Sequence, residues 1–340
     1  MGILMRALGF LVLATSTGCT LVLSETPCDT VAPPGASDPS DTAVDSGPAG
    51  DTNDTGDTGA PLSRTAQALV AGGHHTCAVD LSGAVDCWGL DGESETTAAP
   101  AALIDPTHLS AGYRFTCALA GADPSTPTCW GDESSGQSSP TGNFLGPLAA
   151  GGAHACALAE TGGVACWGRD IEGQTRPPEV VRASESLHLL ASGWLFSCAQ
   201  STADSAPVCW GYDDSGQVST VPAGPLDAMA LGQGFGVGID RTTGQSVCWG
   251  HSDICARVLS EGDEPWAQVV AGLDFACNRS ETGQVTCWGT NANGVLTDVP
   301  ATPFRSITAG PGGRHVCGIL DDGTDQVTCW GLDASGQATP

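Results

Sequence analysis

The triplet Cys-Trp-Gly occurs seven times at intervals near forty residues, and this spacing constrains the fold more than any other feature. The tryptophans of the triplets are Trp88, Trp130, Trp167, Trp210, Trp249, Trp288 and Trp330. The cysteines before them lie 42, 37, 43, 39, 39 and 42 residues apart. Repeats of this length with strand-like content form the blades of a β-propeller or the coils of a β-solenoid. We therefore expect an all-β repeat domain over residues 66–340.

Six of the seven repeats contain two strands of a hairpin that a disulfide can join. In the first repeat, HTCAVD has the alternating pattern of a strand, LSG is a turn, and AVDCWG is the returning strand of the hairpin. If Asp80 pairs with Ala84, Cys77 faces Cys87, and directly opposed Cα atoms in a hairpin lie about 4.5–5.5 Å apart, within disulfide range. The same arrangement predicts five further disulfides: Cys117 with Cys129, Cys156 with Cys166, Cys198 with Cys209, Cys277 with Cys287, and Cys317 with Cys329.

The number of residues between paired cysteines tests this register. Separations of 10 and 12 differ by an even number, so both keep the two cysteines facing each other. The separation of 11 between Cys198 and Cys209 predicts a β-bulge. Structural zinc is the alternative use of paired cysteines, but it favours Cys-x2-4-Cys spacing, so disulfides are the better interpretation if the chain is exported.

The fifth repeat departs from the others. Val237 occupies its first cysteine position, which leaves Cys248 without the usual partner, and an additional Cys255 follows seven residues later. We expect Cys248 to pair with Cys255. The sixteen cysteines then give seven disulfides, with Cys19 and Cys28 remaining near the N-terminus.

The irregular segment of the fifth repeat is also the candidate binding site. After Cys-Trp-Gly it runs HSDICARVLSEGDEPW, with His251, Arg257 and Trp266 where other repeats have short polar turns. Regular positions hold a repeat scaffold together, so a departure from the consensus is the better candidate for function. Exposed Trp and Arg are frequent anchors of interfaces. The alternative is a decayed blade in which Trp266 fills a gap in the core.

The N-terminus has the design of an export signal. MGILMRALGFLVLATSTGC combines Arg6, a short apolar run and small residues before a cleavage point. Ser-Thr-Gly-Cys at positions 16–19 resembles the bacterial lipobox, which predicts a signal peptide over residues 1–18 and a lipid on Cys19. The alternative is an ordinary signal peptide cut nearby, in which case Cys28 becomes the natural disulfide partner of Cys19.

Residues 19–65 are predicted to be a disordered acidic spacer. The segment is rich in Asp, Thr, Gly and Pro, and cannot bury enough apolar surface to offset the entropy of ordering. Calcium binding is the alternative for its Asp-rich part, but an EF-hand loop that began at Asp51 would place Thr55 at its fifth position and Leu62 at its twelfth, where Glu is needed.

The charge of the chain limits its partners. All 11 basic residues are Arg, and 38 Asp and Glu give a net charge of −27. This field repels phosphate backbones, so we expect no nucleic acid partner. Contact with a membrane is expected only through the lipid on Cys19. These features together predict an exported, monomeric lipoprotein of a bacterial cell envelope, anchored in the outer membrane.

The sequence offers no catalytic, cofactor-binding or metal-binding residues. Two residues before the first cysteine position stand His75, Phe115, His154, Phe196, Phe235, Phe275 and His315, and a position that accepts Phe as readily as His needs a flat ring for packing. The tryptophans of the triplets are expected between neighbouring sheets. The recurrent Asp91, Asp170, Asp213 and Asp333 favour Asx turns over catalytic carboxylates.

The repeat resembles the regulator-of-chromosome-condensation repeat. The pattern is a run of small residues and Gly, then aromatic-x-Cys-Ala, Gly-x-Val-x-Cys-Trp-Gly and Gly-Gln, the last at Gly136-Gln137, Gly173-Gln174, Gly216-Gln217 and Gly336-Gln337. The period is similar to the compact bacterial form in β-lactamase-inhibitor propellers. The resemblance covers about residues 66–340 and implies a seven-bladed β-propeller of short antiparallel sheets. The fifth repeat lacks Gly-Gln, and the sixth has Gly294-Val295.

A fold of this kind does not fix a function. We expect a non-enzymatic binding protein that displays its propeller to a protein or an extracellular ligand, and no cofactor. One alternative is an inhibitor of a secreted enzyme, of the β-lactamase-inhibitor type. The other is a propeller hydrolase or lyase, although the chain has no Gly-x-Ser-x-Gly, His-Glu-x-x-His or Walker motif.

Overall fold

The computed structural model describes residues 64–101, 103–121, 124–258 and 265–340. All of them belong to the second of two compact units, Gly59–Pro340. The predicted signal peptide, the lipid on Cys19, the partner of Cys28 and nearly all of the spacer therefore lie outside the described residues.

The described residues form seven three-stranded antiparallel sheets, each made of consecutive strands. Blades one to three are β1 (Ala68–Ala71), β2 (His75–Val79), β3 (Val85–Gly89); β4 (His108–Ala111), β5 (Phe115–Leu119), β6 (Thr128–Gly131); and β7 (Phe144–Ala150), β8 (His154–Ala159), β9 (Val164–Gly168). Blades four and five are β10 (Leu189–Ser192), β11 (Phe196–Gln200), β12 (Val208–Gly211); and β13 (Leu226–Leu231), β14 (Phe235–Asp240), β15 (Ser246–Gly250). Blades six and seven are β16 (Trp266–Ala271), β17 (Phe275–Ser280), β18 (Val285–Gly289); and β19 (Phe304–Thr308), β20 (His315–Leu320), β21 (Val327–Gly331).

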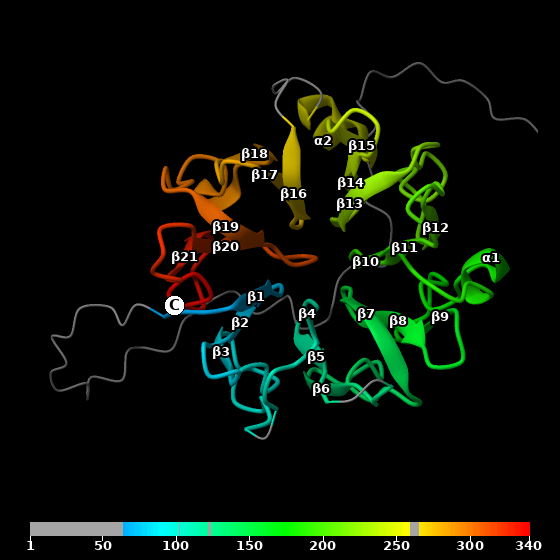
Figure 1. Cartoon of the computed structure of the whole chain (residues 1–340), viewed down its shortest axis with the longest axis horizontal. Helices are drawn as coiled ribbons and strands as arrows, with labels where there is room; N and C mark the ends of the chain where they lie inside the picture. The colour runs from blue at the N-terminus through cyan, green and yellow to red at the C-terminus, as the bar shows by residue number, and fades with distance from the viewer. Residues whose placement is uncertain (1–63, 102, 122–123, 259–264) are drawn as a thin grey trace, which may run out of the picture. The chain divides into compact units, whose positions relative to one another are not determined.

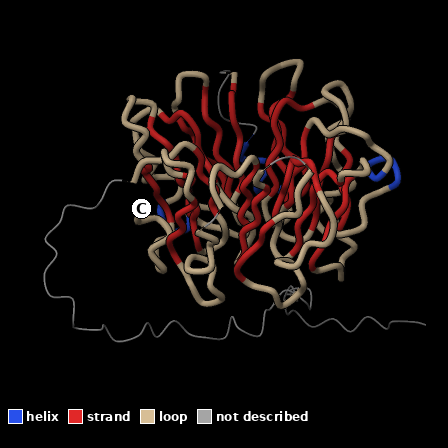
Figure 2. Tube along the Cα trace, turned by 60° about the horizontal axis from the view of Figure 1, so that its bottom comes forward, coloured by secondary structure: helices blue, strands red, loops and turns tan. Residues whose placement is uncertain are grey.

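The seven sheets follow one another around a centre in chain order, with the first strand of each blade innermost (Figure 1). Seen from the side, the strands run between two faces on which the loops gather (Figure 2). Short helices interrupt this pattern at α1 (Glu179–Arg182), α2 (Ser252–Val258) and the 3-10 turn η1 (Ala292–Gly294). None of the helices in the described ranges is long and apolar enough to cross a membrane. The predicted all-β, seven-bladed propeller is confirmed.

The ring closes between the first and last blades. Thr65 bridges to Gln326, and the amide of Ala66 donates to the carbonyl of Asp325 over 3.0 Å. The amide of Val327 donates in return to the carbonyl of Arg64 over 2.8 Å. The segment before β1 thus adds to blade seven, so both ends of the described chain hold the ring together.

The hairpin register is the predicted one in all six regular repeats. Cys77 lies opposite Cys87, and the turn between them closes with the amide of Asp80 donating to the carbonyl of Ala84 over 2.9 Å. Seven disulfides form among the described residues, six across hairpins and the seventh between Cys248 and Cys255. In blade five, Val237 occupies the position opposite Cys248. The number of disulfides matches one for each repeat.

The bulge predicted between Cys198 and Cys209 is wrong. The strands β11 and β12 keep an unbroken register from Phe196 opposite Gly211 to Ala199 opposite Val208. Parity constrains only residues inside the ladder, and here the loop outside it absorbs the odd residue. Register shifts occur instead where first strands pair with second strands, in blades three, five, six and seven.

The tryptophans of the triplets join neighbouring blades, as predicted. Six of them donate Nε1–H over 2.9–3.1 Å to a backbone carbonyl in the turn of the preceding repeat. The accepting residues are Gln337, Glu95, Gln137, Gln174, Gln217 and Val295, each preceded by a residue with φ of 65° to 79°. The Gly-Gln turn is therefore a connector between blades, and glycine suits its left-handed backbone.

The acidic residues of these turns cap the backbone. The Asp91 carboxylate accepts from the amides of Thr96 and Thr97, and the Asp213 carboxylate accepts from those of Val218 and Ser219. Asp170 and Asp333 each accept one equivalent backbone amide. These side chains do hold the turns, as predicted, but the bonds reach amides five and six residues ahead, so the turns are not Asx turns, which use the amide two residues ahead.

Candidate functional site

The junction between blades five and six lacks the regular connector. After β15 the chain forms α2 in place of the Gly-Gln turn, and Trp288 Nε1 of blade six is buried without a hydrogen-bond partner in the described structure. Arg257 of α2 donates from Nη1 to the carbonyl of Gly289, the residue after this tryptophan. The disulfide from Cys248 to Cys255 fastens α2 to β15. A pinned helix with an arginine contact thus replaces the turn.

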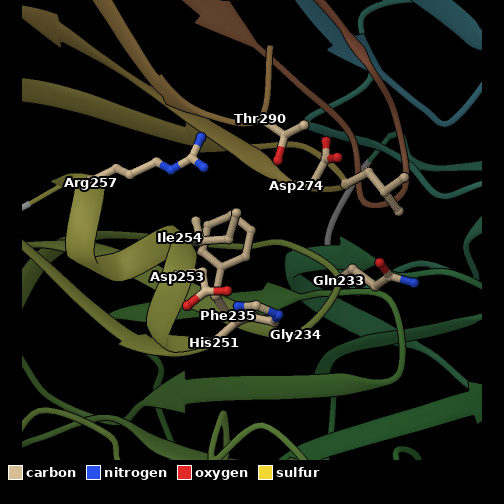
Figure 3. Close-up of a pocket in the computed structure, with 10 residues that line it drawn as sticks. Gln233, Gly234, Phe235, His251, Asp253, Ile254, Arg257, Asp274 and Thr290 are labelled. Atoms are coloured by element: carbon tan, nitrogen blue, oxygen red, sulfur yellow. The ribbon is translucent and has the colours of Figure 1, made fainter. Parts of the chain in front are cut away.

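This replacement leaves a pocket of about 240 Å³ at the blade boundary. Its apolar wall consists of Phe235, Ile254 and Leu273, and its remaining lining is Gln233, Gly234, His251, Asp253, Arg257, Asp274 and Thr290. Figure 3 shows Asp274 and Thr290 on one side, from blade six, with the α2 residues on the other. The pocket therefore combines an apolar base with charged groups of both signs.

The carboxylate of Asp274 is the most unusual group in the pocket. Its Oδ1 is buried and makes no hydrogen bond within the described ranges, while Oδ2 lies 3.8 Å from Arg314 Nη2 of blade seven. Burial raises the pKa of Asp274, and Arg314 opposes that rise. A partly desolvated carboxylate with an unused oxygen favours a hydrogen-bond donor from outside.

Comparison of equivalent positions singles out Asp274 further. We call the position of His75, Phe115 and their equivalents the aromatic slot. The residues directly before it are, in successive blades, His74, Arg114, Ala153, Leu195, Gly234, Asp274 and Arg314. In blade two, Arg114 reaches back to the preceding repeat and pairs with Glu95 over 3.0 Å. The position therefore suits a charge that is neutralised across the blade boundary, and blade six alone places an acid there.

Two of the three predicted binding residues meet in this pocket. His251 and Arg257 both line it, and both are exposed residues of the irregular segment. Trp266 does not line it; it begins β16, is half-buried, and packs against the core cluster that includes Phe235 and Trp288. Trp266 therefore does not join the other two in the pocket.

Sequence reasoning missed the residues that blade six contributes. Asp274 and Thr290 occupy regular repeat positions, so no irregularity marks them. Comparison of the repeats position by position would have found Asp274, since it is the one acid among the seven equivalent positions.

The buried histidines are structural. His75, His154 and His315 are at most 1% exposed, and each Nε2 bonds a hydroxyl of the next blade, at Thr116, Ser197 and Thr76 respectively. Burial is the main cause that lowers their pKa, to about 3, about 4 and about 3. Among the described residues no group of three or more His, Cys, Asp or Glu could hold a metal ion.

The fold and its repeated connectors define a seven-bladed β-propeller with disulfide-closed hairpins. Residues 148–174 match the family model described as the regulator of chromosome condensation (RCC1) repeat. This stretch of the third repeat is thus an RCC1-type repeat, in agreement with the resemblance seen in the sequence. Its seven disulfides are typical of proteins that fold in an oxidising, exported compartment.

Solved structures share this fold. The ectodomain of the Physcomitrella patens receptor kinase CR4 is 27% identical with a TM-score of 0.65, over 77% of this chain and 72% of that one. The CRINKLY WD40 ectodomain of the Arabidopsis thaliana receptor kinase ACR4 is also 27% identical with a TM-score of 0.65, over 82% of this chain and 99% of that one. Prp20p from Saccharomyces cerevisiae shares the fold at 16% identity and a TM-score of 0.57, over 78% and 81% of the two chains.

Proposed function

We propose that this chain is an exported, non-enzymatic binding protein that recognises a partner protein at the junction of blades five and six. The observation that carries the proposal is the pocket where α2 replaces the regular connector. A scaffold that repeats one contact around its ring is built for rigidity, and its one irregular junction is the place where recognition can be added. The likeness to two receptor ectodomains supports an extracellular role.

The pocket chemistry favours binding over catalysis. The catalytic motifs considered in the sequence are absent, and the pocket-lining polar groups combine a single histidine with carboxylates and an arginine that is already bonded to the backbone. The three buried histidines, His75, His154 and His315, are bonded to neighbouring blades and take no part in the pocket.

Affinity capture with matched variants tests the binding function. Wild-type protein, the double variant His251→Ala/Arg257→Ala and the control Arg182→Ala would be immobilised and exposed to the secreted and envelope fractions of the source organism. Arg182 is the matched control because it is an exposed arginine in the last turn of α1, in another blade. We expect a protein retained by wild type and control but lost by the double variant. Equal retention by all three would reject the proposed site.

We further propose that a lipid on Cys19 anchors the protein in a bacterial outer membrane, with the acidic segment as a spacer. Support comes from the signal-like start and the Ser-Thr-Gly-Cys sequence at positions 16–19. A diacylated cysteine anchors stably where a single acyl chain does not. Mass spectrometry of the mature N-terminus should find a lipidated Cys19, and an unmodified N-terminus elsewhere would exclude this anchor.

A further inference from the structure

The size of the pocket between blades five and six limits what can enter it. Its volume of about 240 Å³ lies below the roughly 300–1,000 Å³ of sites that enclose a small-molecule ligand. A single side chain from a partner is the better match. The apolar wall of Phe235, Ile254 and Leu273 suits a side chain with a long hydrocarbon stem.

Asp274 indicates that the end of this side chain carries a positive charge. Its Oδ1 is buried without a hydrogen-bond partner in the described part of the chain, and the ion pair it makes, at 3.8 Å, is with blade seven. In blade two the same repeat position holds Arg114, which pairs with Glu95 of the preceding repeat. A charge at this position is therefore placed to pair with an opposite charge across the blade boundary. Asp253 adds a second, exposed carboxylate to the pocket.

Resting on the proposed binding function, we propose that the pocket receives an arginine or lysine side chain of the partner protein, with its cationic head against Asp274. The methylene stem lies along the apolar wall while the charged end reaches the carboxylate, the usual division within long basic side chains. The net charge of −27 draws cationic surfaces toward the molecule. Arg257, whose Nη1 donates to the Gly289 carbonyl, forms part of the wall.

An anionic side chain is the competing occupant, since Arg257 and His251 also line the pocket. The charge of the whole molecule opposes it, and an anion would leave the unused oxygen of Asp274 without a donor. Titration with basic and acidic peptides distinguishes the two occupants.

The test uses short peptides and does not require the partner. The full-length protein with its disulfides intact is titrated with Ac-Gly-Arg-Gly-NH2, its lysine counterpart, and matched peptides with norleucine or glutamate at the centre, followed by amide chemical shifts. We expect the basic peptides to bind at least tenfold more tightly than the norleucine peptide, with the shifts centred on Asp253, Asp274 and Thr290. Equal binding of the norleucine peptide, or shifts centred elsewhere, would overturn the proposal, and preferential binding of the glutamate peptide would assign the pocket to an anion.

Two variants separate the pocket from general attraction to an acidic protein. Asp274→Asn should abolish the preference for basic peptides, whereas Asp204→Asn, which removes the same charge at an exposed loop of blade four, should change it less than twofold. A preference that survives Asp274→Asn contradicts the proposal. Because the shift map is made on wild-type protein, the proposal stays testable even if Asp274→Asn fails to fold.

Failure of this inference and failure of the binding function give different results. If Asp274→Asn keeps full affinity for a captured partner that His251→Ala/Arg257→Ala loses, the site binds a protein but not through a basic side chain. If basic peptides bind as expected and no partner distinguishes the variants, the chemistry of the pocket stands and the proposed protein-binding function fails.

Discussion

At the scale of single residues, the aromatic slot shows how the blades are matched to one another. Where the slot holds His, the next blade offers a hydroxyl: Thr116 to His75, Ser197 to His154 and Thr76 to His315. Where the slot holds Phe, the corresponding residue of the next blade is apolar or Gly: Ala155, Gly236, Ala276 and Val316. A buried imidazole needs a hydrogen-bond partner and a phenyl ring does not. His and Phe are therefore exchangeable only together with the residue that they face.

The buried histidines should make the protein acid-sensitive, and a paired exchange should relieve part of that sensitivity. Burial lowers the pKa of His154 to about 4, so the unfolded chain binds its proton at higher pH than the folded chain does. The free energy of unfolding is therefore unaffected by the protonation of His154 above the unfolded pKa of about 6.5. It declines as the pH falls toward 4, by about 2 kcal/mol at pH 5. We expect His154→Phe/Ser197→Ala, which copies the Phe115 and Ala155 pair, to lose about 2 kcal/mol less between pH 7 and pH 5. Urea unfolding at both pH values measures this, and an identical pH dependence in variant and wild type would contradict it.

Two tryptophans in neighbouring blades offer a matched comparison of the connector. Trp249 and Trp288 are 3% and 4% exposed, but only Trp249 donates its Nε1–H, to the Gln217 carbonyl over 3.1 Å. Substitution of each by Phe removes similar packing, whereas the hydrogen bond is lost only in blade five. We expect Trp249→Phe to lower the free energy of unfolding by about 1 kcal/mol more than Trp288→Phe. Equal costs in chemical denaturation would show that the connector hydrogen bond adds no net stability.

At the scale of elements, α2 depends on its disulfide. The helix has seven residues, Ser252–Val258, far fewer than the roughly 12–15 that a marginally stable isolated helix needs. Ile254 anchors one face of it in the core cluster, and Cys255 ties it to β15. In the other repeats the two halves of a disulfide already face each other in a hydrogen-bonded ladder. The disulfide of blade five therefore positions a helix that lines the pocket, while the others reinforce existing strands.

Removal of that disulfide should loosen α2 and the pocket selectively. Cys248→Ser/Cys255→Ser opens a short loop and should lower the free energy of unfolding by about 2 kcal/mol. We also expect faster amide exchange over residues 252–257 and weaker peptide binding to the pocket. The control Cys277→Ser/Cys287→Ser should lower stability while β17 and β18 keep their exchange protection, because the ladder persists. Unchanged exchange in α2 would mean that packing alone holds the helix.

At the scale of the whole molecule, the sequence predicted those features that repeat from blade to blade. The hairpin register, the cysteine pairs and the tryptophan packing each recur around the ring, so their pattern is visible along the chain. Contacts that occur once leave no such pattern. The bridge from Thr65 to Gln326 and the contribution of Asp274 to the pocket went unpredicted, because each joins residues that only the closed fold brings together. The irregular segment drew attention to His251, Arg257 and Trp266 alike, and the structure brings only the first two into the pocket, because a departure from the consensus does not tell whether a side chain faces solvent or core.

Ring closure gives the last prediction, since it depends on a short segment before the first strand. Arg64 and Ala66 exchange backbone hydrogen bonds with Val327 and Asp325, and Arg305 Nη2 donates to the Ala66 carbonyl over 3.1 Å. Ala66 is fully buried in a cluster that also holds Trp88 and Val327. A chain that begins at residue 67 loses these three hydrogen bonds, each with a net value of about 1 kcal/mol, and exposes the seam between blades one and seven.

We expect this shortened chain to be less stable by about 3 kcal/mol than a control that begins at residue 63, measured by chemical denaturation. We also expect faster amide exchange in β1 and β21 than in β10 and β11, because an open ring separates first at its seam. Equal stability of the two chains, with no difference in exchange at the seam, would show that the propeller closes through side-chain contacts such as His315 with Thr76 and does not need the leading segment.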